Sequence, residues 1–416
     1  MRLPAVARWL AATALACATQ GCLHRRGDWS AGEHAVAEPT RAGVKLVVLG
    51  NAGWAGAGAA KVAREVDRVL ADAHAGPSSP IVLWLGNNVM ARRGDRRRHD
   101  CREARRAWTR PGVGQLAEAV RAHLARGHAS YAVAGEQDWR CGSAPEQRQL
   151  HPDEHGHPWQ MPAAHYVVRI LGDGRSEIAS TCDDGTCRLA DRDEQAPALA
   201  ELVMIDATAW LHRDAMAESV GEQMMRELTS LLEALDADRD IALPRILVTH
   251  FPVEAAGWHG QGGGAPDSTW PTLPRSLRQA LAAGSFVGVV AAHDHGVYAD
   301  ADISDAVKRS DRVWLPAPLF QIVSGGASAR AGGPRRMRHF GSVTLVPDLY
   351  APDLGFAVVD LDPARIEVTL HARRVGRWTR SRLSFPLHRP PHPHETLTPA
   401  MSPCLRCAEV PANERP

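Results

Sequence analysis

Hydrophobic residues in this chain gather in short continuous runs, separated by longer segments in which they recur at helical spacing. Continuous apolar runs, typical of strands covered on both faces, occupy residues 44–49, 81–85, 131–134, 245–249 and 287–291. Helical spacing is found over residues 59–73, 114–126, 218–235 and 277–283. Strands that alternate with helices predict a largely parallel sheet.

Two regions follow a different pattern. Residues 166–206 predict shorter strands, with a turn at Asp183-Asp184-Gly185. Residues 320–385 read almost wholly as strands, with apolar runs at 321–323, 342–345, 356–361 and 366–371. We therefore expect an α/β core that ends in a strand-rich C-terminal part.

Five of the apolar runs end in short motifs that carry polar side chains. They are Gly50-Asn51-Ala52-Gly53, Gly86-Asn87-Asn88, Gly135-Glu136-Gln137-Asp138, Thr249-His250-Phe251-Pro252-Val253 and His293-Asp294-His295. A residue at the C-terminal end of a sheet strand points into the crevice where α/β folds bind their ligands. Histidine, asparagine and glutamate at five such ends predict a metal centre.

The order and spacing of these motifs resemble the calcineurin-like metallophosphoesterases, especially the purple acid phosphatase-like branch, over about residues 44–385. Residues 159–166 are similar to the family's W-x-x-P-x-x-Y-Y segment, and residues 203–206 to its next strand. The resemblance implies an α/β fold: a four-layer α/β/β/α sandwich of two mixed sheets flanked by helices. It places the site along one edge of the sheets.

Several positions depart from the family's ligand pattern. Asn51 and Asn87 stand where the family has a metal-binding aspartate and a bridging aspartate. Met90 stands at a tyrosine position, and Gln137 where a histidine near the substrate phosphate is usual. Bridging two cations about 3.5–4 Å apart requires anionic oxygens that offset their repulsion. A full two-metal centre is therefore not expected.

The remaining positions retain metal-binding chemistry. His250, His293 and His295 match the family's three histidines, and Glu136 replaces an asparagine. Glu136, His250 and His293 form a plausible set for one divalent metal such as zinc, iron or manganese. His295 would belong to the weaker first-metal position. His259 resembles a further histidine near the substrate, which makes His259 and His295 the candidate catalytic residues.

Two functions remain open from these residues. The first is a pseudo-phosphatase that binds an anionic or phosphorylated ligand or a partner. The second is a one-metal phosphoesterase that uses Glu136, His250 and His293. A third and weaker reading gives Asp138 the role of a missing carboxylate ligand, although orienting a loop suits that residue better.

The N-terminus predicts export. Arg2 and Arg8 precede an apolar stretch at residues 9–18 that is too short to span a membrane. Residues 1–22 read as a signal peptide that ends at Cys22, a candidate lipidation site, and residues 23–43 as a tether. We expect a membrane-anchored lipoprotein or a periplasmic or cell-surface protein. A plain cleaved signal is the alternative, and Cys17 is a weaker candidate for lipidation.

Cysteine use agrees with an exported chain, where disulfides are stable. Besides Cys17 and Cys22, the chain has two close pairs, Cys182 with Cys187 and Cys404 with Cys407. This leaves Cys101 to pair with Cys141, although the connectivity cannot be derived from sequence. Metal binding by the two close pairs is a weaker alternative.

Composition adds little beyond this. Hydrophobic residues make up 44% and charged residues 23% of the chain, as in ordinary soluble domains. A net charge of +1 gives no reason to expect a nucleic-acid partner. The arginine-rich residues 92–106 predict a solvated surface or an anion-attracting rim beside the site. Residues 386–416, rich in proline and histidine, predict a disordered tail.

Overall fold

Two mixed β-sheets packed face to face form the centre of the protein. The computed structural model describes residues 43–53, 57–75, 80–89, 113–149, 158–183, 185–191, 197–238, 243–253, 255, 274–304, 319–327, 338–340, 343–345, 348–351, 354–374 and 376–387. All of them fall within one compact unit, residues 41–416. Within the described chain, no helix combines the length and the apolar composition needed to span a membrane.

The first sheet has the strand order β18-β17-β16-β1-β2-β3. Its strands are β1 (Val44–Leu49), β2 (Pro80–Leu85), β3 (Ser130–Val133), β16 (Gly355–Leu361), β17 (Arg365–Arg374) and β18 (Arg377–Pro386). β1, β2 and β3 are parallel, whereas β16, β17 and β18 form an antiparallel meander beside β1. The parallel half carries three of the five strand ends predicted to bear site residues.

The second sheet has the strand order β15-β11-β12-β10-β9-β8-β4-β5. Its strands are β4 (His165–Leu171), β5 (Ser176–Ile178), β8 (Ala198–Ile205), β9 (Arg245–Thr249), β10 (Gly288–Ala291), β11 (Val297–Asp300), β12 (Phe320–Ser324) and β15 (Leu349–Ala351). β8, β9, β10 and β12 are parallel neighbours, and the outer strands are antiparallel. The other two strand ends of the predicted site belong to β9 and β10.

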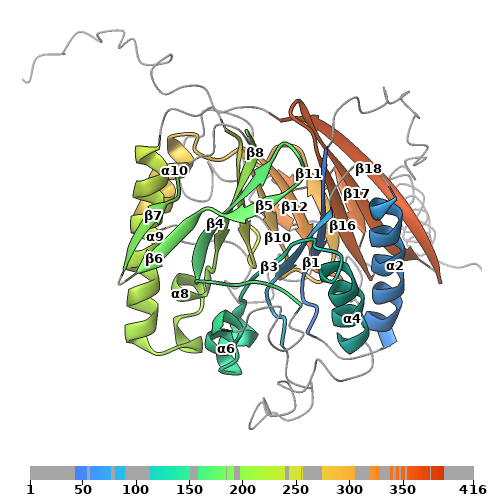
Figure 1. The fold of residues 1–416 in the computed structure, drawn as a ribbon, viewed down its shortest axis with the longest axis horizontal. Helices are drawn as coiled ribbons and strands as arrows, with labels where there is room; N and C mark the ends of the chain where they lie inside the picture. The colour runs from blue at the N-terminus through green and yellow to red at the C-terminus, as the bar shows by residue number, and fades with distance from the viewer. Residues whose placement is uncertain are drawn as a thin grey trace, which may run out of the picture. The chain divides into compact units, whose positions relative to one another are not determined.

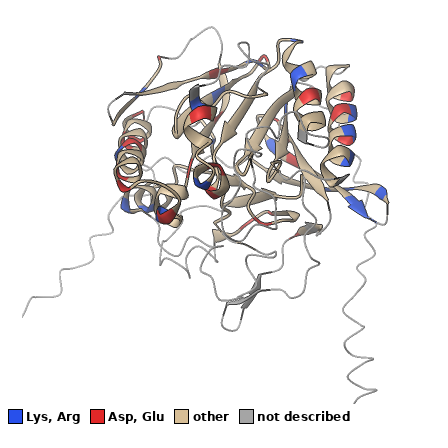
Figure 2. Cartoon of the chain, turned by 90° about the horizontal axis from the view of Figure 1, so that it is seen from below, with Lys and Arg blue, Asp and Glu red and all other residues tan. Residues whose placement is uncertain are grey.

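Helices cover the outer face of each sheet. α2 (Ala57–His74) and α4 (Val113–Leu124) lie on the first sheet, and α9 (Glu218–Ala237) and α10 (Arg275–Ala282) on the second (Figure 1). Charged residues of both signs mark these helices, while the sheets between them are mostly uncharged (Figure 2). The predicted α/β/β/α sandwich of two mixed sheets is therefore confirmed.

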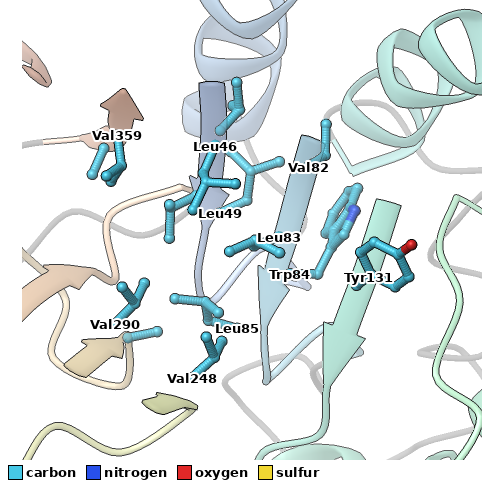
Figure 3. Packing of buried hydrophobic residues seen from close by; sticks show 14 of the residues in the cluster. Leu46, Leu49, Val82, Leu83, Trp84, Leu85, Tyr131, Val248, Val290 and Val359 are labelled. Carbon is cyan, nitrogen blue, oxygen red and sulfur yellow. The ribbon is translucent and has the colours of Figure 1, made fainter. Parts of the chain in front are cut away.

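The core between the sheets explains why the strand patterns are so apolar. Leu83 and Leu85 of β2 face Val248 and Val290 of the second sheet (Figure 3), and all four are fully buried. The hydroxyl of Ser324, the last residue of β12, donates to the Val48 carbonyl at 2.6 Å and so links the two sheets. Strands that are covered on both faces need apolar residues at every position.

Alternate side chains of β8 are buried on opposite faces of the second sheet. Leu202 and Met204 belong to the core between the sheets, while Val203 and Ile205 pack with the leucines of α9. Successive side chains of a strand point to opposite faces, so one strand contributes to both cores.

The prediction of shorter strands over residues 166–206 is wrong for two strands. β4 has seven residues and β8 has eight. Arg169 and Glu201 interrupt the apolar pattern of these strands, but they lie opposite each other in the β4–β8 register and are both buried. Because the two charges pair across the ladder, the strands continue through them.

Short strands do form the expected turn. β6 (Ser180–Asp183) and β7 (Thr186–Leu189) make a hairpin, with Gly185 at a left-handed φ of 83°. Cys182 and Cys187 face each other across it and form the predicted disulfide. Cys141 is buried, and its predicted partner Cys101 lies outside the described residues, as do Cys404 and Cys407, so those pairings stay predictions.

Several short elements escaped prediction. They are helices α5 (Glu136–Arg140), α6 (Ala144–Gln149) and α8 (Thr208–Leu211), and a 3₁₀ turn at Arg213–Ala215. The strand predicted at 342–345 is present as β14 (Val343–Leu345), which pairs with β13 (Arg338–Phe340). Helices of one or two turns are too short to show a hydrophobic period. At the C-terminal end, β18 runs to Pro386, one residue beyond the predicted end of the domain at residue 385, and Leu387 is also buried, so the predicted tail begins in the fold.

Candidate metal centre

Five strand ends from the two sheets meet at one place. Residues that follow β1, β2, β3, β9 and β10 supply Asn51, Asn87, Glu136, His250 and His293, all of which are buried. Asn51, Asn87 and His293 have left-handed φ angles of 54°, 52° and 50°. Such backbone strain in residues other than glycine is concentrated at functional sites.

Gly86 permits the close approach of these loops. It has a φ of 77°, and a Cβ added there would lie 2.6 Å from His250 Nδ1 and 2.8 Å from the Gly135 nitrogen. Any side chain at this position would displace the His250 ring. The glycine that ends the second apolar run is therefore required by the site and not merely by the turn.

Glu136, His250 and His293 form a compact triangle of donor atoms, which we call the strand-end site. Glu136 Oε2 lies 3.0 Å from His250 Nε2 and 3.6 Å from His293 Nδ1. His250 Nε2 and His293 Nδ1 are 3.2 Å apart. Ligands about 2.0–2.1 Å from a tetrahedral zinc ion are about 3.3 Å from one another. The three donors therefore fit one divalent metal.

Neighbouring groups orient two of these donors. His250 Nδ1 donates to the Leu85 carbonyl at 2.5 Å, which directs Nε2 toward Glu136 and His293. Asn87 Nδ2 donates to Glu136 Oε1 at 2.9 Å, which leaves Oε2 facing the histidines. Metal-binding histidines usually donate their second ring N–H in this way. The arrangement is that of a supported metal site.

Phe251 packs against the imidazoles of the site. Its ring centroid lies 4.8 Å from that of His250 and 4.6 Å from that of His293. His212 stacks on Phe251 at 5.0 Å. Neither of these packing residues was predicted from the sequence, although Phe251 directly follows His250. An aromatic wall restricts ring rotation and so holds the donors in place.

The charge of Glu136 and that of His250 stabilise each other. Burial opposes ionisation of Glu136, but His293 and His250 outweigh it and hold the pKa of this carboxyl well below its usual value. Burial also opposes a charge on His250, yet Glu136 beside it raises the pKa of this imidazole. Without a metal, the site therefore holds a carboxylate beside the imidazole of His250, whose protonated form that carboxylate stabilises.

Zinc binding at the strand-end site is expected to strengthen as pH rises. Because Glu136 raises the pKa of His250, a proton occupies Nε2 at low pH and must leave when the metal binds. Affinity should increase about tenfold per pH unit below that pKa and level off above it. Calorimetry in buffers of different ionisation enthalpy should show about one proton released per zinc. An affinity independent of pH from 5 to 8 would contradict this.

The amide pair, Asn51 and Asn87, occupies the position where the family has its two aspartates. Asn51 Nδ2 donates to the carbonyls of His293 and Gly325, each at 3.1 Å. Asn87 Nδ2 donates to Asn51 Oδ1 at 3.2 Å, and Asn87 Oδ1 accepts from the Gln137 nitrogen at 3.0 Å. The amide hydrogens thus connect oxygens that would otherwise repel one another. These residues do not fit a second metal.

Asn51→Asp is expected to destabilise the metal-free protein by about 2–4 kcal/mol. The new carboxylate oxygen would face the His293 and Gly325 carbonyls, where an N–H donor now lies. Urea denaturation in the presence of a chelator measures the change in free energy of unfolding. A variant as stable as the wild type would show that the amide hydrogen bonds carry little weight.

The remaining residues predicted for the site do not belong to the triangle of donor atoms. His295 is half-buried and lies outside the group of donors formed by Glu136, His250 and His293. Gln137 is half-buried, and its Nε2 donates to Glu136 Oε1 at 3.4 Å. Met90, His259, Cys22 and the arginine-rich residues 92–106 lie outside the described residues.

Asp138 organises the loops around the site. Its carboxylate accepts from the backbone nitrogens of Gly135 and Val89, at 2.9 and 2.8 Å, and from Gln147 Nε2 at 2.9 Å. Burial raises its pKa to about 6, although these hydrogen bonds favour the charged form. With its oxygens engaged in this way, Asp138 fixes the loop after β3 and does not supply a ligand.

Comparisons with known proteins agree with this fold. No family model and no curated protein matches the chain. Among solved structures, GAP50, the anchor in the inner membrane complex of Plasmodium, has 15% identity, covers 84% of this chain and 90% of its own, and gives a TM-score of 0.52.

Two further solved structures are similar at lower scores. Purple acid phosphatase PPD1 from yellow lupin seeds has 11% identity, covers 83% of this chain and 54% of its own, and gives a TM-score of 0.47. PhoD has 8% identity, with 85% and 72% covered and a TM-score of 0.44.

The two-sheet architecture and the similarity to GAP50 identify the fold. The chain has the fold of the calcineurin-like metallophosphoesterases, with amides where that family has its metal-binding aspartates. Its strand-end site holds a glutamate and two histidines that could bind one metal.

Proposed function

We propose that this protein is a pseudo-phosphatase: a metallophosphoesterase-fold protein that binds one divalent metal and, through it, an anionic or phosphorylated ligand, without efficient hydrolysis. The observation that carries this proposal is the triangle of Glu136, His250 and His293, with donor distances of 3.0, 3.2 and 3.6 Å. A bound metal there would supply positive charge and attract phosphate oxygens.

The amide pair supports the loss of hydrolysis. Two metals together stabilise the attacking and leaving oxygens of phosphoryl transfer. Here Asn87 Nδ2 joins Asn51 Oδ1 to Glu136 Oε1, so a hydrogen-bonded amide stands where a bridging carboxylate is needed. The ligand of the strand-end site would then be held at one point only, which favours binding over turnover.

The location and the partner of the protein are part of the same proposal. The Cys182–Cys187 disulfide favours an oxidising compartment, in agreement with the expected signal peptide. GAP50, which shares the fold, is described as an anchor in a membrane complex. An exported protein with a lipid anchor at Cys22 could present the strand-end site to phosphate-bearing molecules at a membrane surface.

Metal content and phosphate binding test the proposal together. The chain lacking residues 1–22 is loaded with zinc, and its metal content is determined by inductively coupled plasma mass spectrometry. Inorganic phosphate is then titrated by calorimetry, and para-nitrophenyl phosphate serves as the hydrolysis probe. We expect metal-dependent phosphate binding and hydrolysis at the background rate. Absence of metal from the strand-end site would reject the proposal.

One observation favours a second candidate, a one-metal phosphoesterase. Three protein ligands leave one position of a tetrahedral site open, as in catalytic zinc sites. Hydrolysis of the same probe above background, and its loss in His250→Ala, would establish this function in place of the first.

A further inference from the structure

Three histidines from two separate segments of the chain come together outside the strand-end site. His74, His123 and His128, the histidine cluster, each offer a ring nitrogen, and these nitrogens lie within 4.8 Å of one another. His123 Nδ1 is 3.4 Å from His74 Nε2. The three rings stack with centroids 4.4 to 5.2 Å apart.

The fold itself builds the histidine cluster. His74 is the last residue of α2, and His123 lies in the last turn of α4. Gly127, at a φ of 83°, lies in the turn after α4 and reverses the chain, so that the His128 ring stacks on that of His123. The Ala129 carbonyl accepts from the Val82 nitrogen at 3.1 Å and fixes this loop to β2. The positions are therefore set by helix packing and by one glycine turn.

The histidine cluster offers buried ring nitrogens that no hydrogen bond to the described residues uses. His123 is only 1% exposed, and His74 Nδ1 is buried with no hydrogen-bond partner among the described residues. His123 Nε2 is likewise buried without such a partner. A ring nitrogen that no hydrogen bond uses keeps the lone pair that a metal requires.

The cluster is separate from the strand-end site. His74 precedes β2, and His123 and His128 precede β3, whereas Asn87 and Glu136 follow those strands. The two places thus lie at opposite ends of the parallel strands, about 20 Å apart for strands of six residues. No residue of one contributes to the other.

We propose that His74, His123 and His128 form a second metal site, which takes a divalent first-row transition metal of imidazole preference, zinc being the probe of choice. Three histidines and one open position make a known zinc set. The His74–His123 donor distance already matches the edge of about 3.3 Å of a tetrahedral zinc site. His128 and His74 are half-buried, so their rings can turn out of the stack to converge on the ion.

Zinc titration with counted equivalents tests the proposal on the chain lacking residues 1–22. We expect two equivalents in the wild type, one in His250→Ala, one in His128→Gln, and none when both substitutions are combined. His128→Gln is chosen because His128 is half-buried, and circular dichroism confirms that the variant is folded. The same number of equivalents in His128→Gln as in the wild type would overturn the proposal, whether or not the strand-end site binds metal.

The positive charge of Arg126, beside the histidine cluster, provides a second test, in which zinc affinity should change in a defined direction. Arg126 is exposed and close enough to lower the pKa of all three histidines. Arg126→Gln should strengthen zinc binding by about two- to fivefold in the His250→Ala background at low salt, because it removes a repelling cation. Unchanged affinity in this variant would place the zinc elsewhere and contradict the assignment.

Discussion

Replacing His250 with alanine is expected to weaken zinc binding at the strand-end site by more than about 100-fold, since loss of even an indirect supporting contact costs 10–100-fold. His250 Nε2 is the donor nearest to both other donors, at 3.0 Å from Glu136 and 3.2 Å from His293. Its removal also leaves the buried Glu136 carboxylate with one imidazole instead of two. Competition with a chromophoric chelator measures the affinity.

His295→Ala is the matched control for this substitution. His295 lies two residues from His293 but outside the group of donors that includes Glu136 and His250. Its replacement should change zinc affinity by less than about threefold, a difference of roughly 0.7 kcal/mol. If His295→Ala loses the metal as fully as His250→Ala does, the ion is held by a different set of ligands.

Glu201→Gln should produce the largest loss of stability, about 3–5 kcal/mol in the free energy of unfolding. Glu201 is fully buried between two arginines, with Arg245 Nε at 2.9 Å and Arg169 Nε at 3.4 Å. Glutamine keeps the shape but leaves two buried cations without their shared anion. The arginines also donate to backbone carbonyls, as Arg245 Nη1 does to that of Leu235 at 2.8 Å. Because these contacts remain in the variant, we expect a loss near the lower end of this range. Urea denaturation measures it.

Glu177→Gln is the control that separates the effect of burying a carboxylate from the effect of pairing it with Arg169. Glu177 also contacts Arg169, at 3.0 Å, but it is 45% exposed. An exposed pair contributes about 0–1 kcal/mol, so this variant should remain close to the wild type. Equal losses for Glu177→Gln and Glu201→Gln would show that charge pairing, and not burial, decides the effect.

Much of the fold follows from local patterns. Apolar runs ending at Leu49, Leu85 and Thr249 predicted β1, β2 and β9 to within one residue, because strands covered on both faces must be apolar throughout. β4 and β8 were harder to predict. Arg169 and Glu201 look like breaks in a strand until their pairing across the ladder is known.

The candidate site was only partly predictable. The strand-end motifs pointed to Glu136, His250 and His293, because polar residues after parallel strands meet at one edge of a sheet. The hydrogen bonds that orient the site residues could not be predicted from the sequence. That Asn51 donates to two carbonyls, and that His250 is oriented by Leu85, depends on loops brought together from both sheets.

By itself, the sequence determined the main strands and helices and the five strand ends, and the resemblance to a known family showed amides at its aspartate positions. Apolar runs and strand-end motifs are properties of neighbouring residues, which local periodicity and side-chain chemistry express directly. Tertiary structure alone decided which donors face one another. His74 and His123, 49 residues apart, meet only because α2 and α4 end side by side on the first sheet. Distances in space between such residues are set by packing, which no local pattern encodes.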